Sequence, residues 1–72
     1  MFSKTESITM TLSGVNDAAA QHAAVKALRQ VDGVKYAAVN RRLSVAEVTF
    51  SPKKTTVDTI TQALAQAGFS VL

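Results

Sequence analysis

The side chains that could do chemistry are few and scattered along this sequence. It contains one histidine, His22, and five carboxylates, none of which stands beside another: Glu6, Asp17, Asp32, Glu47 and Asp58. A general acid and base need two such groups held near each other, and no nucleophile–base set can be identified either. Cysteine is absent, which excludes disulfides, a thiolate metal site and a thiol nucleophile. We therefore predict that the protein is not an enzyme.

Asp17 and His22 are the only pair that the sequence offers as metal ligands. Asp17 stands at the predicted start of a helix, and His22 lies about one turn further along. Residues five apart do not share a helix face well, and two ligands make a poor site. We interpret His22 as a solvated helix residue and expect no cofactor. Weak metal binding by Asp17 and His22 is kept as an alternative.

Length and charge limit the class of protein. The 72 residues are 47% apolar, which predicts one globular domain with its core at about residues 6–72. The formal net charge is +3, and the cations are scattered except for Arg41-Arg42 and Lys53-Lys54. No apolar run approaches the ~18–20 residues that span a bilayer, and the first residues show no signal-peptide pattern. We expect a cytoplasmic protein that does not insert into a membrane.

The elements that must position these side chains begin with a strand and a helix. Residues 6–12 alternate between apolar and polar, which predicts a half-buried strand that ends at Gly14. Asn16-Asp17 offers an N-cap for a helix over residues 18–31, where small and apolar residues recur at the 3,4 spacing of a buried stripe. Gly33 follows that helix and is typical of a helix end.

The second half of the chain predicts a hairpin, a helix and a last strand. Residues 34–39 and 45–50 read as two strands joined around Asn40-Arg41-Arg42. Thr56 is the expected cap of a helix over residues 57–67, and residues 69–72 form a short strand. The predicted fold class is α+β. The element order βαββαβ predicts a ferredoxin-like sandwich, with two helices on one face of a four-stranded antiparallel sheet of strand order 4-1-3-2. This topology places residues 14–20, 40–42 and 68–69 at one end of the sheet and Lys53-Lys54 at the other.

Nucleic-acid binding is not expected, although RNA-recognition motifs share this topology. Those domains stack bases on aromatic side chains of the open sheet face. Here that face would carry one aromatic residue, Tyr36, together with the acidic Glu47. The basic pairs are typical of solvated turns.

The segment between the first strand and the first helix carries a family resemblance. Gly14-Val15-Asn16-Asp17-Ala18-Ala19-Ala20 resembles the Gly-Met-Thr-Cys-Ala-Ala-Cys loop of heavy-metal-associated domains, found in copper chaperones and in N-terminal modules of metal-transporting P-type ATPases. The similarity extends from about Ile8 to Val71 through motifs that keep their order: Lys26-Ala27-Leu28, Val31-Asp32-Gly33-Val34, Val39-Asn40, Ala46-Glu47-Val48-Thr49-Phe50, Pro52 and Ala67-Gly68-Phe69-Ser70-Val71. The resemblance implies the same fold and a place in metal transport.

The residues that bind metal in that family are replaced in this chain. Its members hold a soft ion such as Cu(I) between two thiolates at a helix N-terminus. The matching positions are Asp17 and Ala20, so the family's metal binding does not carry over at this degenerate loop of Gly14, Val15, Asn16, Asp17 and Ala20. What the resemblance still implies is a scaffold role for Gly14, packing of Val15, and a place for Phe69 beside the loop.

The resemblance also implies where a partner would bind. In family members the loop end is where partner proteins dock, and here it retains Val15, Arg41, Arg42 and Phe69, an apolar centre with a basic rim. We expect the domain to act through contacts with a protein of a metal-handling system or with a second copy. One alternative is a carrier that uses Asp17 and His22 or a site shared between chains. Another is a purely structural or dimerisation module.

Overall fold

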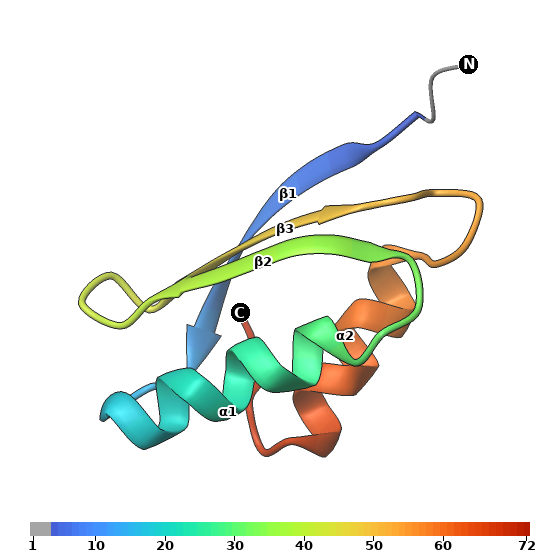
Figure 1. The fold of residues 1–72 in the computed structure, drawn as a ribbon. Coiled ribbons are helices and arrows are strands. Elements are labelled where there is room, and N and C mark those ends of the chain that lie inside the picture. Colours follow the sequence, from blue (N-terminus) through green and yellow to red (C-terminus); the bar gives the residue numbers. More distant parts are fainter. Residues whose placement is uncertain (1–3) are drawn as a thin grey trace.

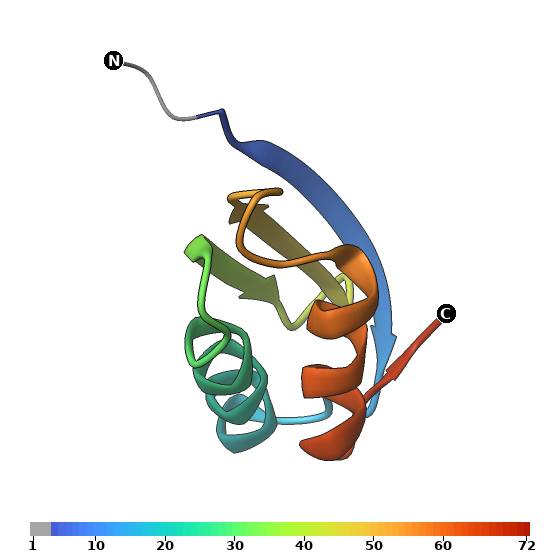
Figure 2. The ribbon, with the colours of Figure 1, turned by 90° about the vertical axis from the view of Figure 1, so that its right-hand side faces the viewer.

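Two helices lie side by side on one face of a sheet in the computed structural model, which describes residues 4–72 (Figure 1). The elements are β1 (Glu6–Ser13), α1 (Ala18–Arg29), β2 (Val34–Asn40), β3 (Val45–Phe50), α2 (Val57–Gln66) and β4 (Ser70–Val71). The four strands pair antiparallel in the order β2-β3-β1-β4, which is the predicted order 4-1-3-2 read from the other edge. Figure 2 shows both helices on the same side of the sheet. The predicted fold class is confirmed.

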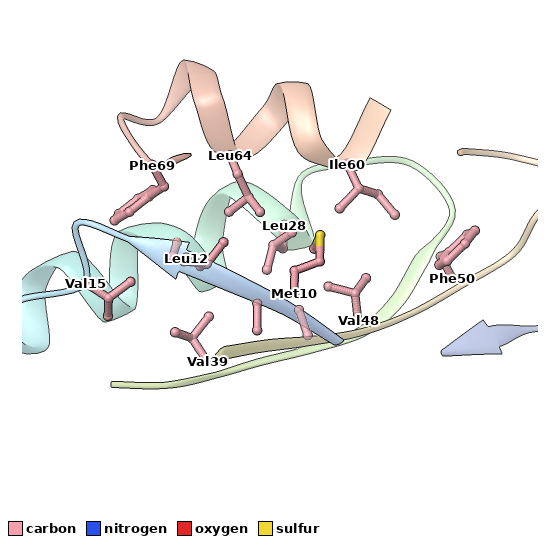
Figure 3. Close-up of a cluster of buried hydrophobic side chains, with 13 residues drawn as sticks. Met10, Leu12, Val15, Leu28, Val39, Val48, Phe50, Ile60, Leu64 and Phe69 are labelled. Atoms are coloured by element: carbon pink, nitrogen blue, oxygen red, sulfur yellow. The ribbon is translucent and has the colours of Figure 1, made fainter. Parts of the chain in front are cut away.

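Strand alternation decides which side chains form the core. Every second residue of the strands faces the helices, and these side chains meet the apolar stripes of α1 and α2 (Figure 3). The buried hydrophobic residues are Met10, Leu12, Val15, Ala24, Leu28, Ala37, Val39, Ala46, Val48, Phe50, Ile60, Leu64 and Phe69. Alanines at three of these sites let the helices approach the sheet closely. This packing holds α1 at a fixed position against the strands.

Both predicted helix caps are present. The Asp17 side chain accepts a hydrogen bond from the Ala20 N–H at 2.7 Å, and the Thr56 hydroxyl accepts one from the Thr59 N–H at 3.2 Å. Each bond satisfies a backbone donor that the first turn of a helix leaves free. α1 ends at Arg29, two residues before the predicted end, because the chain turns there toward Gly33.

The end of α2 explains why the last strand is shorter than predicted. Gly68 adopts a left-handed conformation (φ +98°), and the Phe69 N–H donates back to the Leu64 carbonyl at 2.9 Å. Phe69 therefore belongs to the helix termination, and β4 contains only Ser70 and Val71.

Strand register sets which segments meet at each end of the sheet. Thr11 of β1 lies opposite Val45 of β3, so the end of β1 meets the turn between β2 and β3. At the far end, a Cβ atom added to Gly33 would come within 2.7 Å of the Lys54 Cβ, so Lys54 packs against the segment that joins α1 to β2. None of the helices within residues 4–72 is long and apolar enough to cross a membrane.

Candidate functional site

Three segments meet at one end of the molecule, which we call the loop end. They are the loop and first turn of α1 at residues 14–20, the β2–β3 turn at residues 41–44, and residues 68–69. A Cβ atom added to Gly14 would lie 3.5 Å from the Phe69 ring and 3.7 Å from the Gly68 carbonyl oxygen. The Leu12 N–H donates to the Ser44 carbonyl at 2.7 Å, which ties the turn to β1. The structure thus brings together the segments that the predicted topology placed here.

The residues of the degenerate loop differ in what they expose. Val15 is buried, Ala20 is half-buried, and Asn16 and Asp17 are exposed. Asp17 has an extended backbone (φ −151°, ψ 177°), as an N-cap residue should, and its carboxylate is directed at the start of the helix. The first turn of α1 carries no other acidic residue, so Asp17 alone complements the positive end of its dipole.

These residues do not fit the ion that the family's thiolates bind. One Asp17 oxygen is engaged in the cap, Ala20 has no ligand atom, and His22 lies exposed on α1. No group of three or more histidine, cysteine, aspartate or glutamate side chains that could hold a metal ion occurs in the part of the chain that the structure describes. A soft ion prefers sulfur ligands, and the loop supplies none.

The exposed surface of the loop end comes mainly from the β2–β3 turn. Val15 and Phe69 are only 5% and 6% exposed, and Figure 3 shows them at one end of the core cluster. Arg41 and Arg42 are exposed, as expected for turn residues. Leu43 is 64% exposed and supplies an apolar side chain beside these cations. Leu43 was not singled out from the sequence, and its only signal there is an apolar residue inside a predicted turn.

The conformation of this turn is held by specific bonds. The Asn40 side-chain oxygen accepts from the Leu43 N–H at 3.0 Å, an arrangement in which the side chain stands in for a backbone turn bond. Ser44 is the one non-glycine residue with positive φ (+55°) among residues 4–72. The turn extends past the sheet in Figure 1. The bonds from Leu43 to Asn40 and from Leu12 to Ser44 hold its backbone in one conformation.

A hollow of about 450 Å³ lies beside the turn, along β2. Its lining combines residues from α1, β2, the turn and β3: Gln21, Ala38, Val39, Asn40, Arg41, Leu43, Val45 and Glu47. Gln21 Nε2 donates to the Val39 carbonyl oxygen at 2.6 Å across this hollow's edge. Gln21 was also missed from the sequence, because its partner lies 18 residues away and is a backbone atom.

Comparison with known proteins identifies relatives, although no family model matches the sequence. The chain is 34% identical over 64 residues to the mercuric transport protein periplasmic component of Shewanella putrefaciens, which covers 89% of this chain and 70% of the relative. The crystal structure of oxidized MerP from Ralstonia metallidurans CH34 is 32% identical, with a TM-score of 0.91 and 96% of each chain covered. A copper binding domain from HMA7, a P-type ATPase, is 29% identical, with a TM-score of 0.88 and 92% of each chain covered.

These relatives correct one prediction and establish the family. The expected cytoplasmic location is wrong, because the mercuric transport relatives from Shewanella and Pseudomonas are named as periplasmic components. The prediction had relied on the lack of a targeting pattern in the first residues, and a folded domain's own composition does not record its compartment. The predicted family is confirmed by identity above 30% along most of the chain. The chain belongs to the heavy-metal-associated domain family, which includes mercuric transport proteins and copper-binding domains.

Proposed function

We propose that this domain serves a metal-transport system of the periplasm through protein contacts at its loop end, without carrying the ion at its own loop. Membership of a family of transport and chaperone domains supports the first part. The second part rests on the two positions at which other family members have thiolates. In this chain Asp17 caps α1 with a 2.7 Å hydrogen bond, and Ala20 is half-buried. This capping bond stabilises the start of α1 with protein groups alone.

The turn residues support a role in protein contacts. Arg41 and Arg42 form a basic rim around the exposed Leu43, and arginine next to an apolar centre is typical of protein interfaces. The Asn40 side chain and the bond from Leu12 hold this group in place before a partner arrives. Preorganised contacts cost less ordering entropy on binding. An acidic partner surface fits the two arginines best.

A metal titration tests the first half of the proposal. The wild-type domain and the double variant Asp17→Cys/Ala20→Cys are each titrated with Cu(I) and with Hg(II) against a competing thiol chelator. We expect the double variant to retain the ion and the wild type to lose it, because only the variant supplies two thiolates at a helix N-terminus. Tight stoichiometric binding by the wild type would contradict the proposal. Loss of that binding in Asp17→Ala and His22→Ala would then identify a carrier with non-thiolate ligands.

In-cell cross-linking tests the second half. A photo-reactive amino acid is placed at Arg42 in one variant and at Lys53, at the far end of the molecule, in a matched control. We expect cross-links to a component of a metal-transport system from position 42 and few from position 53. Stronger cross-linking from position 53 would place the working surface at the opposite end. Cross-links only between copies of the chain would favour a dimerisation module.

A further inference from the structure

The edge of the sheet formed by β2 differs from the edge formed by β4. β2 has seven residues and borders only β3, whereas β4 has two residues. A free edge strand offers unpaired N–H and C=O groups to another chain, and a very short edge strand offers few.

The Val39 carbonyl bonds to the side chain of Gln21, so it points away from β3. In an antiparallel strand the N–H and C=O of one residue point the same way, and so do those of residues two positions apart. Ala37 and Val39 therefore direct their backbone groups to the free edge.

Only half of this edge is suited to pairing with an added strand. The register between β2 and β3 shifts between Val34 and Tyr36, and such a bulge disturbs edge pairing around Lys35. The regular half begins after Tyr36 and ends at the turn. The 450 Å³ hollow lies along this same half, where the consecutive residues Ala38, Val39 and Asn40 line it. The free space thus coincides with the regular part of the edge.

Gln21 occupies the hydrogen-bonding position that an added strand would need. Its amide donates to the Val39 carbonyl at 2.6 Å, and Val39 is only 6% exposed. An incoming strand would have to displace this side chain in order to bond the carbonyl itself. Gln21 is exposed in part and lies in the second turn of α1, so a change of its rotamer would release the edge without moving the helix.

Charge distinguishes between the segments that could bind here. Cations stand at both ends of β2, with Lys35 at one end and Arg41 and Arg42 at the other, while Glu47 is the one carboxylate in the lining of the hollow. In a second copy paired antiparallel, Lys35 would approach the partner's turn arginines, and like charges across a strand pair are destabilising. An acidic extended segment would instead meet a cation at each end.

We propose that the β2 edge between Ala37 and Asn40 accepts an extended acidic segment of a partner protein as an added strand, with Gln21 competing for the Val39 carbonyl. This inference rests on the proposed function and names the binding mode and the chemistry of the partner. Main-chain bonds would supply the affinity, and the flanking cations would select the acidic sequence.

The test uses a blocked heptapeptide of alternating valine and glutamate as the probe. Two matched peptides serve as controls, one with lysine in place of glutamate and one with proline in place of the central valine, which removes a ladder donor. Binding is followed by NMR through the amide signals of the domain and the hydrogen exchange of the Val39 amide. We expect the acidic peptide to shift the amides of residues 37–40 and to slow exchange at Val39. The lysine and proline peptides should not do so.

Variants at Gln21 test the competition directly. Gln21→Ala removes the competing donor and should tighten binding of the acidic peptide about three- to tenfold, the equivalent of one ordinary hydrogen bond. Gln21→Glu also frees the carbonyl but adds a negative charge, so it should bind the same peptide more weakly than Gln21→Ala. Gln66→Ala, an exposed glutamine on α2, is the matched control and should leave binding unchanged.

Several outcomes would overturn the inference. Equal binding of the acidic and lysine peptides, shifts confined to another surface, or no effect of Gln21→Ala would each do so. Dimerisation of Gln21→Ala through residues 37–40 would show that a second copy is the occupant. If the peptide fails at β2 while cross-links from position 42 still capture a transport component, only this inference fails and the proposed function stands.

Discussion

Replacement of Asp17 by alanine tests whether the former ligand position now has a structural role. The carboxylate accepts the Ala20 N–H at 2.7 Å and is the only acidic group at the start of α1. Loss of an N-cap of this kind costs about 0.5–2 kcal/mol of the free energy of unfolding. For a domain of this size, each 1 kcal/mol corresponds to a fall in Tm of roughly 4–8 °C. With a urea m-value of about 1–2 kcal/mol/M for a small domain, the same loss should lower the urea midpoint by roughly 0.3–2 M.

Two further variants separate the parts of this effect. Asp17→Asn keeps an oxygen acceptor without the charge, so it should retain most of the stability, because asparagine caps helices about as well as aspartate. Asn16→Ala changes an exposed neighbour and should shift the free energy of unfolding by less than about 0.5 kcal/mol. Urea denaturation followed by circular dichroism compares the three variants with the wild type. An unchanged midpoint for Asp17→Ala, or a larger loss for Asn16→Ala, would refute the assignment of Asp17 as the cap.

Three more predictions concern the core and the turn. Leu28→Ala should lower the free energy of unfolding by about 2–5 kcal/mol in urea denaturation, since Leu28 is 0% exposed and the change leaves a cavity; a loss below 1 kcal/mol would contradict the packing. Ser44→Gly should raise the Tm slightly, because the roughly 1–2 kcal/mol of left-handed strain relieved at φ +55° exceeds the ~0.5–1 kcal/mol of extra chain entropy that glycine loses on folding. A lower Tm would mean that the strain is smaller than this entropy cost. Charge reversal at Arg41 and Arg42 should slow association with the cross-linked partner in stopped-flow measurements. The free energy of unfolding should stay within about 0.5 kcal/mol of the wild-type value. Association rates equal to those of the wild type would exclude both arginines from the interface.

Much of the fold was predictable because it depends on local patterns. The alternation in residues 6–12 predicted β1, and the polar residues before each apolar stripe predicted the caps at Asp17 and Thr56. The errors lie at element ends, where tertiary contacts decide. α1 stops at Arg29, and Phe69 belongs to the end of α2, because turns and backbone bonds there compete with the helix and strand patterns.

The site was predictable only where a motif marked it. The loop at residues 14–20 was found through its resemblance to a known motif, and the turn arginines were found as a charge pair. Gln21 and Leu43 were missed because neither forms part of a motif, and the bond from Gln21 to Val39 arises only when β2 folds against α1. The burial of Val15 and Phe69 also depends on the folded core, and Leu43 is the more exposed apolar side chain at the loop end.

The capping bond of Asp17 also bears on how such a loop can change during evolution. Alanine is the best helix former, and aspartate is among the best N-caps, so the residues at positions 20 and 17 suit a helix start without any ion. A lineage that acquired them could therefore lose its metal chemistry while its domain stayed folded. The two reverse substitutions differ in their effect on stability. Cysteine at position 20 costs little, whereas cysteine at position 17 removes the 2.7 Å capping bond to Ala20 before metal binding by two thiolates can offset that loss. Recovery of metal binding is thus expected to begin at position 20.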